Sequence, residues 1–479
     1  MEADNLTKEL FAGDPNIKLL TDDLGSNRST IYPFDCPPLD IPFGGGIAAG
    51  RIYEFYGIFS SGKTTFALAI SKIFADFMRK QKDDNYSILW IESESTFERE
   101  RYHFMGCPPL KVALLETDVL ELGHRTIKTY LRRCLQKKMR LLIVWDTIAA
   151  TLTEKQKNVT DTIAKKSGEK AAKAAKKDIL TKQNLVGESD EDNSSGDDED
   201  DKKSKTNPGG MMEKPRLIRD MLKDITTELG ATDSTLIILN QATTNPGRFQ
   251  TTIESSGGHG LKHFASVRGF MQSVDTYPFE DAEGNKKEMY VSRITFVKNK
   301  LTGLIKTTVN LIVDKEEGLN TLATRISFLK QEKILPSSIG GWTPLKFPTD
   351  YAKNPRSEFE WMELKYQSVK QLIDVIQRYP QCLEWLDYKI YLKFISGSSL
   401  MKIHNIKKVW EFEKKFWGQN ITKLTEREAE TIKFFNHGSV KPSDIIGFVP
   451  KITVQPKAII AKLPEKKPVE KVEKKEVIS

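Results

Sequence analysis

The sequence predicts an α/β fold built on a mostly parallel, twisted sheet. Short apolar runs without polar alternation are typical of strands that are buried on both faces of such a sheet. The first run is followed by a glycine-containing loop and then by a helical pattern of apolar residues over Thr65–Arg79. Strands that alternate with helices in this way pair in parallel through right-handed crossovers. The runs are Arg51–Tyr56, Ser87–Ile91, Leu141–Trp145 and Thr235–Leu239.

Further elements are expected towards the C-terminus. Tyr290–Val297 and Thr307–Val313 favour additional strands of the same sheet. Residues 343–440 are rich in aromatic residues and in helical periods, as at Val369–Tyr379 and Lys408–Trp417. A chain of 479 residues accommodates two or three domains, so this region is expected to form a second domain.

The composition argues against membrane insertion and against an oxidising compartment. No run of 18 or more apolar residues occurs, and the polar, acidic start MEADNLTKEL is unlike a signal or transit peptide. The four cysteines are scattered without a C-x-x-C pair, which fits a reducing compartment better than disulfides or a structural zinc ion. We therefore expect a cytoplasmic protein without a membrane partner.

The charge is unevenly distributed along the chain. The formal net charge is +8, but residues 188–201 (ESDEDNSSGDDEDD) hold nine acidic residues and no Lys or Arg. With these nine negative charges set aside, the rest of the chain carries +17. A basic body favours a polyanionic partner, with nucleic acid as the first expectation. Lys-rich soluble proteins are common, however, so the charge alone decides little.

The segment GIFSSGKTT carries a phosphate-binding loop. It fits the pattern G-x-x-x-x-G-K-[ST] between a predicted strand and a predicted helix, which is the context that this motif requires. Its backbone N–H groups wrap the phosphates, Lys63 reaches the β and γ oxygens, and the Thr64 hydroxyl joins the shell of a Mg²⁺ ion. Asp146, at the end of LLIVWD, is the carboxylate expected behind the metal. The predicted contacts are Gly57, Ser60, Ser61, Gly62, Lys63, Thr64, Thr65 and Asp146.

Hydrolysis of a nucleotide also needs a group that orients or deprotonates the attacking water. Glu92 and Glu94 close the strand SILWIESE. If this strand neighbours the strand of the phosphate loop, both carboxylates emerge at the edge of the sheet where ligands bind. Alternate residues share one face of a strand, so either glutamate can be the base.

Seven segments, in order from about Leu39 to Trp342, resemble the RecA recombinase family. They are RIYEFYGIFSSGKTT, WIESE, VWDTIAATLT, LIILNQ, GGHGLKHFASVR, FVKNK, and EEGLN together with GGW. The resemblance implies a RecA-like P-loop ATPase core that forms a helical filament on DNA, with ATP and Mg²⁺ held between neighbouring protomers. It puts the catalytic role on Glu94 and the sensor role on Gln241. Finally, it implies that Lys298 and Lys300 reach the ATP of a neighbour.

The resemblance also implies two loops that contact DNA. The first follows the acidic run, and the second spans Ala242–Ser256 and is closed by the segment that begins at Gly257. Arginines in these loops would contact phosphates, while a methionine and a phenylalanine would wedge between bases or stack on them. Such loops suit sequence-independent binding of single strands, although an ordinary surface loop has a similar composition. The residues expected at the DNA are Met211, Arg216, Arg248, Phe249, Gly257 and Gly258.

The chain departs from the family pattern in three respects. The family packs a Tyr on adenine, and the residue aligned with that Tyr in this chain is Arg101, which Tyr102 follows. Because a guanidinium plane also stacks on a base, the choice between the two residues stays open. The charged insertion is not part of the bacterial pattern, and we expect its acidic run to compete with DNA for the basic interior. Bacterial members tend to end in an acidic tail, whereas this chain ends in a basic one. The short N-terminal segment and the divergent C-terminal domain look more like the phage UvsX-type branch than like a cellular RecA.

The expected domains follow from these matches. They are an N-terminal oligomerisation segment (1–38), the ATPase core (39–335) with a disordered charged insertion (155–207), a smaller C-terminal domain (336–449) and a basic disordered tail (450–479).

The predicted function is that of a DNA-dependent ATPase and recombinase, which coats single-stranded DNA and exchanges it into a homologous duplex. A single-strand-binding protein and a loading mediator are further expected partners, and the location is the cytoplasm, that of the host if the gene is phage-borne. One alternative is a helicase of the same fold. Two features argue against it, the segment GGHGLKHFASVR and the two lysines of FVKNK. Another is a filament or mediator protein that binds ATP and DNA without strand exchange.

Overall fold

In the computed structural model the chain forms two compact units. The first contains the chain up to Tyr277 together with Glu288–Thr324, and the second contains Pro278–Lys287 and most of the chain from Arg325 onward. The structure describes residues 30–162, 213–246, 251–280, 284–348, 360–394, 399–417, 422 and 457–460.

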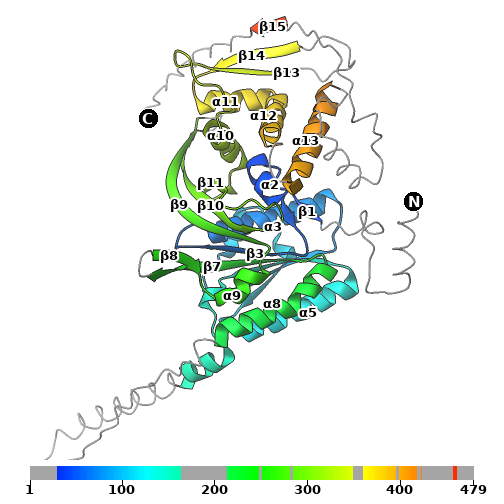
Figure 1. The fold of residues 1–479 in the computed structure, drawn as a ribbon, viewed down its shortest axis with the longest axis vertical. Coiled ribbons are helices and arrows are strands. Elements are labelled where there is room, and N and C mark those ends of the chain that lie inside the picture. The colour runs from blue at the N-terminus through cyan, green and yellow to red at the C-terminus, as the bar shows by residue number, and fades with distance from the viewer. Residues whose placement is uncertain are drawn as a thin grey trace, which may run out of the picture. The chain divides into compact units, whose positions relative to one another are not determined.

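A ten-stranded sheet forms the centre of the first unit (Figure 1). Its strands lie in the order β12-β11-β10-β9-β3-β7-β6-β4-β5, and β8 pairs with β7. The neighbours from β9 to β5 are all parallel, whereas β11 is antiparallel to β10 and β12, and β8 is antiparallel to β7. The predicted α/β class with a mostly parallel sheet is therefore confirmed. The strands are β3 (Ile52–Gly57), β4 (Tyr86–Glu92), β5 (Val112–Glu116), β6 (Arg140–Asp146), β7 (Thr235–Pro246), β8 (Thr251–Ser255), β9 (Val267–Glu280), β10 (Lys286–Asn299), β11 (Thr308–Asp314) and β12 (Gly318–Leu319).

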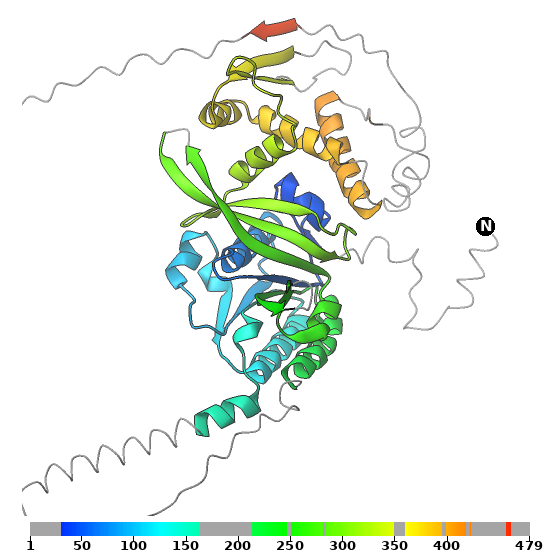
Figure 2. The same ribbon diagram turned by 60° about the vertical axis from the view of Figure 1, so that its left-hand side comes forward.

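The central strands are buried on both faces, as their apolar runs predict. In β6, Leu142 and Val144 belong to the core cluster that includes α3 (Lys63–Lys80). The alternate residues, such as Ile143, belong to the opposite cluster, which includes α5 (Leu120–Lys137) and α8 (Glu213–Ala231). Helices therefore cover both faces of the sheet, and the strand ends are left free to build a site. Figure 2 shows the two longest strands, β9 and β10, beside each other.

Shorter elements complete the first unit. Before the core, a two-stranded sheet packs beside α2, where Asp40 accepts hydrogen bonds from the backbone N–H groups of Phe34 (2.7 Å) and Cys36 (2.9 Å). This buried carboxylate thereby fixes the turn that enters the core. The elements are β1 (Ile31–Tyr32), α2 (Pro37–Phe43), β2 (Ile47–Ala48), α4 (Arg99–Phe104), the 3₁₀ turns Pro109–Lys111 and Ile148–Ala150, α9 (Gly258–Phe264) and α10 (Thr321–Gln331), of which α10 continues into the second unit.

The start of the charged insertion is helical, which corrects the prediction that disorder begins at residue 155. Residues 154–162 form a helix. Thr153 and Gln156 cap it reciprocally, because each backbone N–H is bonded to the other side chain, at 2.9 and 3.2 Å. This is a capping box, and its T-x-x-Q pattern was readable in the sequence. The acidic run 188–201 lies outside the described residues.

The second unit combines strands with helices. β13 (Thr343–Pro348) pairs antiparallel with β14 (Glu360–Tyr366), and α11 (Val369–Arg378), α12 (Pro380–Lys393) and α13 (Ser399–Trp417) follow. A short strand, β15 (Lys457–Ile460), pairs in parallel with β14. This strand corrects the prediction of a wholly disordered tail from residue 450; its KAII sequence supplies the apolar, β-branched residues that strands favour. In the described parts of both units, no helix is long and apolar enough to cross a membrane.

Candidate functional site: a nucleotide cleft at the strand ends

The phosphate loop lies between the end of β3 and the start of α3. Gly62 has a left-handed backbone (φ 86°) as the residue before the helix. A Cβ on Gly57 would collide with the carbonyl of Met271 on the neighbouring strand β9. Both glycines are therefore required by geometry. The loop leads directly into the N-terminus of α3, and helix N-termini bind anions well.

Lys63 is folded back over its own loop. Its ammonium donates to the carbonyls of Ile58 (2.8 Å) and Gly57 (3.2 Å) and to the hydroxyl of Ser61 (3.3 Å). Partial burial lowers the pKa of Lys63. If a phosphate group bound in the loop, its negatively charged oxygens could replace these neutral oxygens as the partners of the partly desolvated ammonium, and such charge-assisted hydrogen bonds are stronger.

Thr64 and Asp146 meet at the next position of the site. The Thr64 hydroxyl donates to Asp146 Oδ2 at 2.7 Å, and Asp146 is buried at the end of β6. Burial, together with the charges of Glu92 and Glu94, raises the pKa of Asp146 to about 7. A hydroxyl and a carboxylate oxygen fit Mg²⁺, which binds hard oxygen ligands together with phosphates and water. A cation there would also compensate the buried carboxylate.

The structure separates the two candidate glutamates of SILWIESE. Glu92 is buried and accepts the backbone N–H groups of Glu94 (2.9 Å) and Thr96 (3.4 Å), so it shapes the turn after β4. Glu94 is exposed in the cleft, and its Oε1 accepts the Thr147 hydroxyl at 2.7 Å and the Gln241 amide at 3.0 Å. Sequence reasoning alone left this choice open. Both carboxylates line the cleft, but only Glu94 is exposed there and bonded to Thr147 and Gln241.

These groups line one cleft of about 1370 Å³. It is large enough for a nucleoside triphosphate, because ligand pockets typically measure about 300–1000 Å³. One wall is formed by the loop and the ends of β4, β6 and β7, another by α4, and a third by β10, β11 and the turn after β11. Its lining includes Gly57, Ser60, Ser61, Gly62, Lys63, Thr64, Thr65, Glu94, Arg101, Phe104, Asp146, Gln241, Tyr290 and Lys315.

Of the two candidates for packing on adenine, only Arg101 lies on the cleft wall. Its guanidinium donates to the Thr65 hydroxyl at 2.5 Å, which holds α4 against α3. Tyr102 is 3% exposed and packs against Trp90 and Phe97, with ring centroids 6.2 and 5.7 Å apart. The wall also presents Phe104, 77% exposed, which sequence reasoning missed because nothing in a six-residue helix signals which residue turns outward.

The structure does not bring Lys298 and Lys300 to the cleft of their own chain. The Lys298 ammonium donates to the carbonyls of Lys262 (2.6 Å) and His263 (2.8 Å), at the C-terminal end of α9. Partial burial and the nearby charge of Lys300 lower the pKa of Lys298 to about 8. Lys300 is exposed.

The residues predicted at the DNA are only partly described. Met211, Arg248 and Phe249 lie outside the described residues. The Arg216 side chain is exposed on α8, and its Nε lies 3.9 Å from Asp220 Oδ2. Gly257 and Gly258 have φ values of 92° and 78° at the start of α9, and a Cβ on Gly258 would lie 2.8 Å from Pro215 Cβ. Close packing of α8 on α9 thus brings Arg216 and the two glycines into one region of the first unit.

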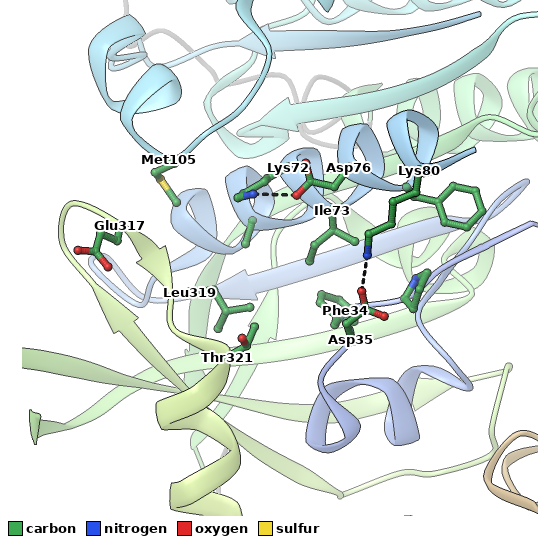
Figure 3. Close-up of a pocket in the computed structure, with 13 residues that line it drawn as sticks. Phe34, Asp35, Lys72, Ile73, Asp76, Lys80, Met105, Glu317, Leu319 and Thr321 are labelled. Carbon is green, nitrogen blue, oxygen red and sulfur yellow. Dashed lines mark hydrogen bonds and ion pairs between the residues drawn. The ribbon is translucent and has the colours of Figure 1, made fainter. Parts of the chain in front are cut away.

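A second, smaller pocket lies along α3 (Figure 3). Its volume is about 270 Å³, and it is lined by Phe34, Ile73 and Leu319 among others. Two ion pairs lie among the residues that line it, Lys72 with Asp76 (2.7 Å) and Lys80 with Asp35 (2.8 Å). It is smaller than the cleft and has no phosphate loop, so it adds nothing to the nucleotide site.

The fold and the site together define a P-loop nucleotide-binding protein of the α/β class, with its ligand cleft at the carboxyl ends of parallel strands. Among known proteins, the chain is similar to the proteins named RecA of several bacteria. It is 24% identical to Protein RecA of Gloeobacter violaceus over 67% of this chain and 71% of that protein, and 24% identical to that of Clostridium beijerinckii over 69% and 74%. The chain is 26% identical to Protein RecA of Mycoplasma mobile, over 62% of this chain and 71% of that protein. These similarities support membership of the RecA family. No family model matches the chain.

Proposed function

We propose that this protein is an ATP-dependent DNA recombinase, which forms a helical filament on single-stranded DNA and exchanges that strand into a homologous duplex. The observation that carries the proposal is the position of Glu94. Its carboxylate accepts hydrogen bonds from Thr147 and Gln241 in the cleft that the phosphate loop lines. The similarity to proteins named RecA supports the same reading.

In the proposed reaction, the loop from Gly57 to Thr65 holds the phosphates of ATP and Lys63 neutralises their charge. Thr64 and Asp146 would hold Mg²⁺, which supplies charge stabilisation at the β and γ phosphates. Glu94 orients the attacking water and accepts its proton, and Gln241 holds the Glu94 carboxylate in place. Arg101 and Phe104 offer a planar cation and an aromatic face to the base.

Lys298 and Lys300 complete the site of a neighbouring protomer in this proposal. Neither lines the cleft of its own chain, and Lys298 is held at the end of α9 by two carbonyls. Cations delivered from a neighbour stabilise the charge that develops on the γ-phosphoryl group, as an arginine finger does. Hydrolysis would then depend on assembly.

The remaining parts of the proposal concern partners. The DNA contacts would be Met211, Arg216, Arg248, Phe249, Gly257 and Gly258, with sequence-independent binding through phosphates and stacked bases. A single-strand-binding protein and a loading mediator are proposed partners, and the cytoplasm, that of the host for a phage-type UvsX-like member, is the proposed location.

The test is to compare ATP hydrolysis with and without single-stranded DNA, and then to assay exchange of a single strand into a homologous duplex. We expect DNA to stimulate hydrolysis and ATP to be required for exchange, with Lys63→Ala inactive in both assays. Stimulated hydrolysis without exchange would replace the recombinase by a filament or mediator protein. Directional unwinding of a duplex would replace it by a helicase.

A further inference from the structure

The two long strands β9 and β10 contact the phosphate loop at its first and last glycines. A Cβ on Gly57 would collide with the carbonyl oxygen of Met271 on β9. A Cβ on Gly62 would lie 3.1 Å from the hydroxyl oxygen of Ser292 on β10. In the sheet β9 is the neighbour of β3, and β10 lies one strand further out. The second contact therefore comes from a strand that does not pair with the strand leading into the loop.

Ser292 is bonded to the loop as well as packed against it. Its hydroxyl donates a hydrogen bond of 2.7 Å to the backbone carbonyl of Ser61. Ser292 is 3% exposed and Ser61 is 1% exposed. A hydrogen bond that is shielded from water in this way is electrostatically stronger than an exposed one, so it holds its two partners firmly.

This bond fixes the orientation of the peptide unit between Ser61 and Gly62. A trans peptide unit is planar, and its C=O and N–H groups point in opposite directions. Because the Ser61 carbonyl points to Ser292, the Gly62 N–H points away from β10. Gly62 then leads into α3 with a left-handed backbone. Backbone N–H groups in such a loop, next to a helix N-terminus, are the groups that bind phosphates.

We propose that Ser292 is a positioning residue for the phosphates of the nucleotide, because its hydroxyl holds the Gly62 N–H in the direction that binding requires. This inference rests on the proposed function only in that ATP binds at the loop. Without the bond, the peptide unit would have to be ordered when the phosphate binds, and that ordering weakens affinity. The N–H meets a phosphate oxygen in the bound substrate and in the transition state alike. The loss is therefore one of binding rather than of kcat.

Two variants at position 292 and a matched control test this role. Ser292→Ala removes the hydroxyl, whereas Ser292→Thr retains one and serves as the rescue. Thr295→Ala is the control, because Thr295 is a half-buried hydroxyl residue of the same strand that lies an odd number of positions away and so faces the other side of the sheet.

The readouts separate binding from stability. The Kd of ATP and the inhibition constant of inorganic triphosphate are measured by displacement of a fluorescent ATP analogue, and kcat is measured at saturating ATP. Inorganic triphosphate has no base, so it reports on the phosphate loop alone. We expect Ser292→Ala to weaken binding of both ligands about fivefold, which is the usual effect of one hydrogen bond. Its kcat should stay within about twofold of wild type. Ser292→Thr and Thr295→Ala should keep the wild-type constants.

Three results would overturn the role of Ser292. The first is wild-type affinity for both ligands in Ser292→Ala. The second is weaker binding of ATP alone, since the effect would then lie at the base. The third is a lower kcat at unchanged affinity in both Ser292→Ala and Thr295→Ala, since a less stable sheet would explain that. If the wild-type protein binds ATP but DNA does not stimulate its hydrolysis, the proposed function fails, and the affinities still decide the role of Ser292. If it binds neither ligand, both proposals fail.

Discussion

At the scale of single residues, the two glutamates at the end of β4, Glu92 and Glu94, have the same chemistry but different surroundings. Glu94→Gln removes the proposed base while keeping its size, so we expect kcat for ATP hydrolysis to fall by about 100-fold or more. ATP binding should persist, because the phosphate loop is untouched. Steady-state hydrolysis together with equilibrium binding of a fluorescent ATP analogue measures both quantities.

Glu92→Gln is the matched control. An amide oxygen at position 92 can still accept the backbone N–H groups of Glu94 and Thr96, which are the bonds that shape the turn. Burial already raises the pKa of Glu92, so the loss of its charge costs little. We expect kcat to stay within about tenfold of wild type. A larger loss in Glu92→Gln than in Glu94→Gln would reassign the base.

The wall of the cleft near α4 gives a second prediction at this scale. Phe104→Ala should raise KM for ATP about fivefold, because a stacked aromatic contact is worth about 1 kcal/mol. Tyr102→Phe should leave KM unchanged, since the Tyr102 ring faces the core. Leu110→Ala is the control for loss of exposed apolar surface, as Leu110 is 98% exposed and does not line the cleft. If Tyr102→Phe raised KM and Phe104→Ala did not, the assignment of this wall would be wrong.

At the scale of elements, much of the core was readable because its signals are local. The apolar runs and the motif G-x-x-x-x-G-K-[ST] predict β3, β4, β6 and α3 to within one or two residues of their observed ends. β9 was missed. Its outer half, from Ser273 onward, alternates little and is largely exposed, so it is a strand only because neighbouring strands pair with it. Likewise, the contacts of Asn240 and Lys298 join residues far apart in the chain, which no local pattern encodes.

The crossing of α8 and α9 yields a prediction for an element. A Cβ on Gly260 would lie 2.5 Å from Arg219 Cβ and 2.9 Å from its Cα, so Gly260→Ala forces the two helices apart. We expect a loss of about 1–3 kcal/mol in the free energy of unfolding. Binding of single-stranded DNA should weaken as well, because Gly257 and Gly258 lie at the start of α9. Urea unfolding and fluorescence anisotropy with labelled DNA measure the two effects.

Gly230→Ala is the control for that variant. It lies in α8 too, yet a Cβ there would meet no atom within 4 Å. Alanine is the better helix former, so the free energy of unfolding should rise by up to about 1 kcal/mol, and DNA binding should be unchanged. Equal losses in both variants would mean that the close helix crossing has no special role.

At the scale of the whole molecule, the proposed site is divided between protomers, and a mixing experiment can test this directly. Lys63→Ala disables the phosphate loop, and Lys298→Ala/Lys300→Ala disables the lysines offered to the neighbour. Each variant should be inactive alone. In a filament of both, an interface is active when an intact loop faces intact lysines. Because such head-to-tail interfaces are asymmetric, random mixing in equal amounts makes about one interface in four active.

The dependence on composition distinguishes this arrangement from a site contained in one chain. We expect DNA-stimulated ATP hydrolysis to rise from near zero to a maximum at the equal mixture and to fall again symmetrically, since activity follows the product of the two fractions. A site within one chain would give no activity at any ratio. Anisotropy of labelled DNA in the same samples shows that mixed filaments have formed, so inactive filaments that still coat DNA would refute the shared site.

Arg293→Ala paired with Lys63→Ala is the matched control. Arg293 lies on β10, as Lys298 does, but its guanidinium is bonded to Asn310 of its own sheet at 2.9 Å. Because its loop and both lysines are intact, the Arg293→Ala protein should be active alone and should lose activity when Lys63→Ala is added, which contrasts with the maximum expected for the lysine variant.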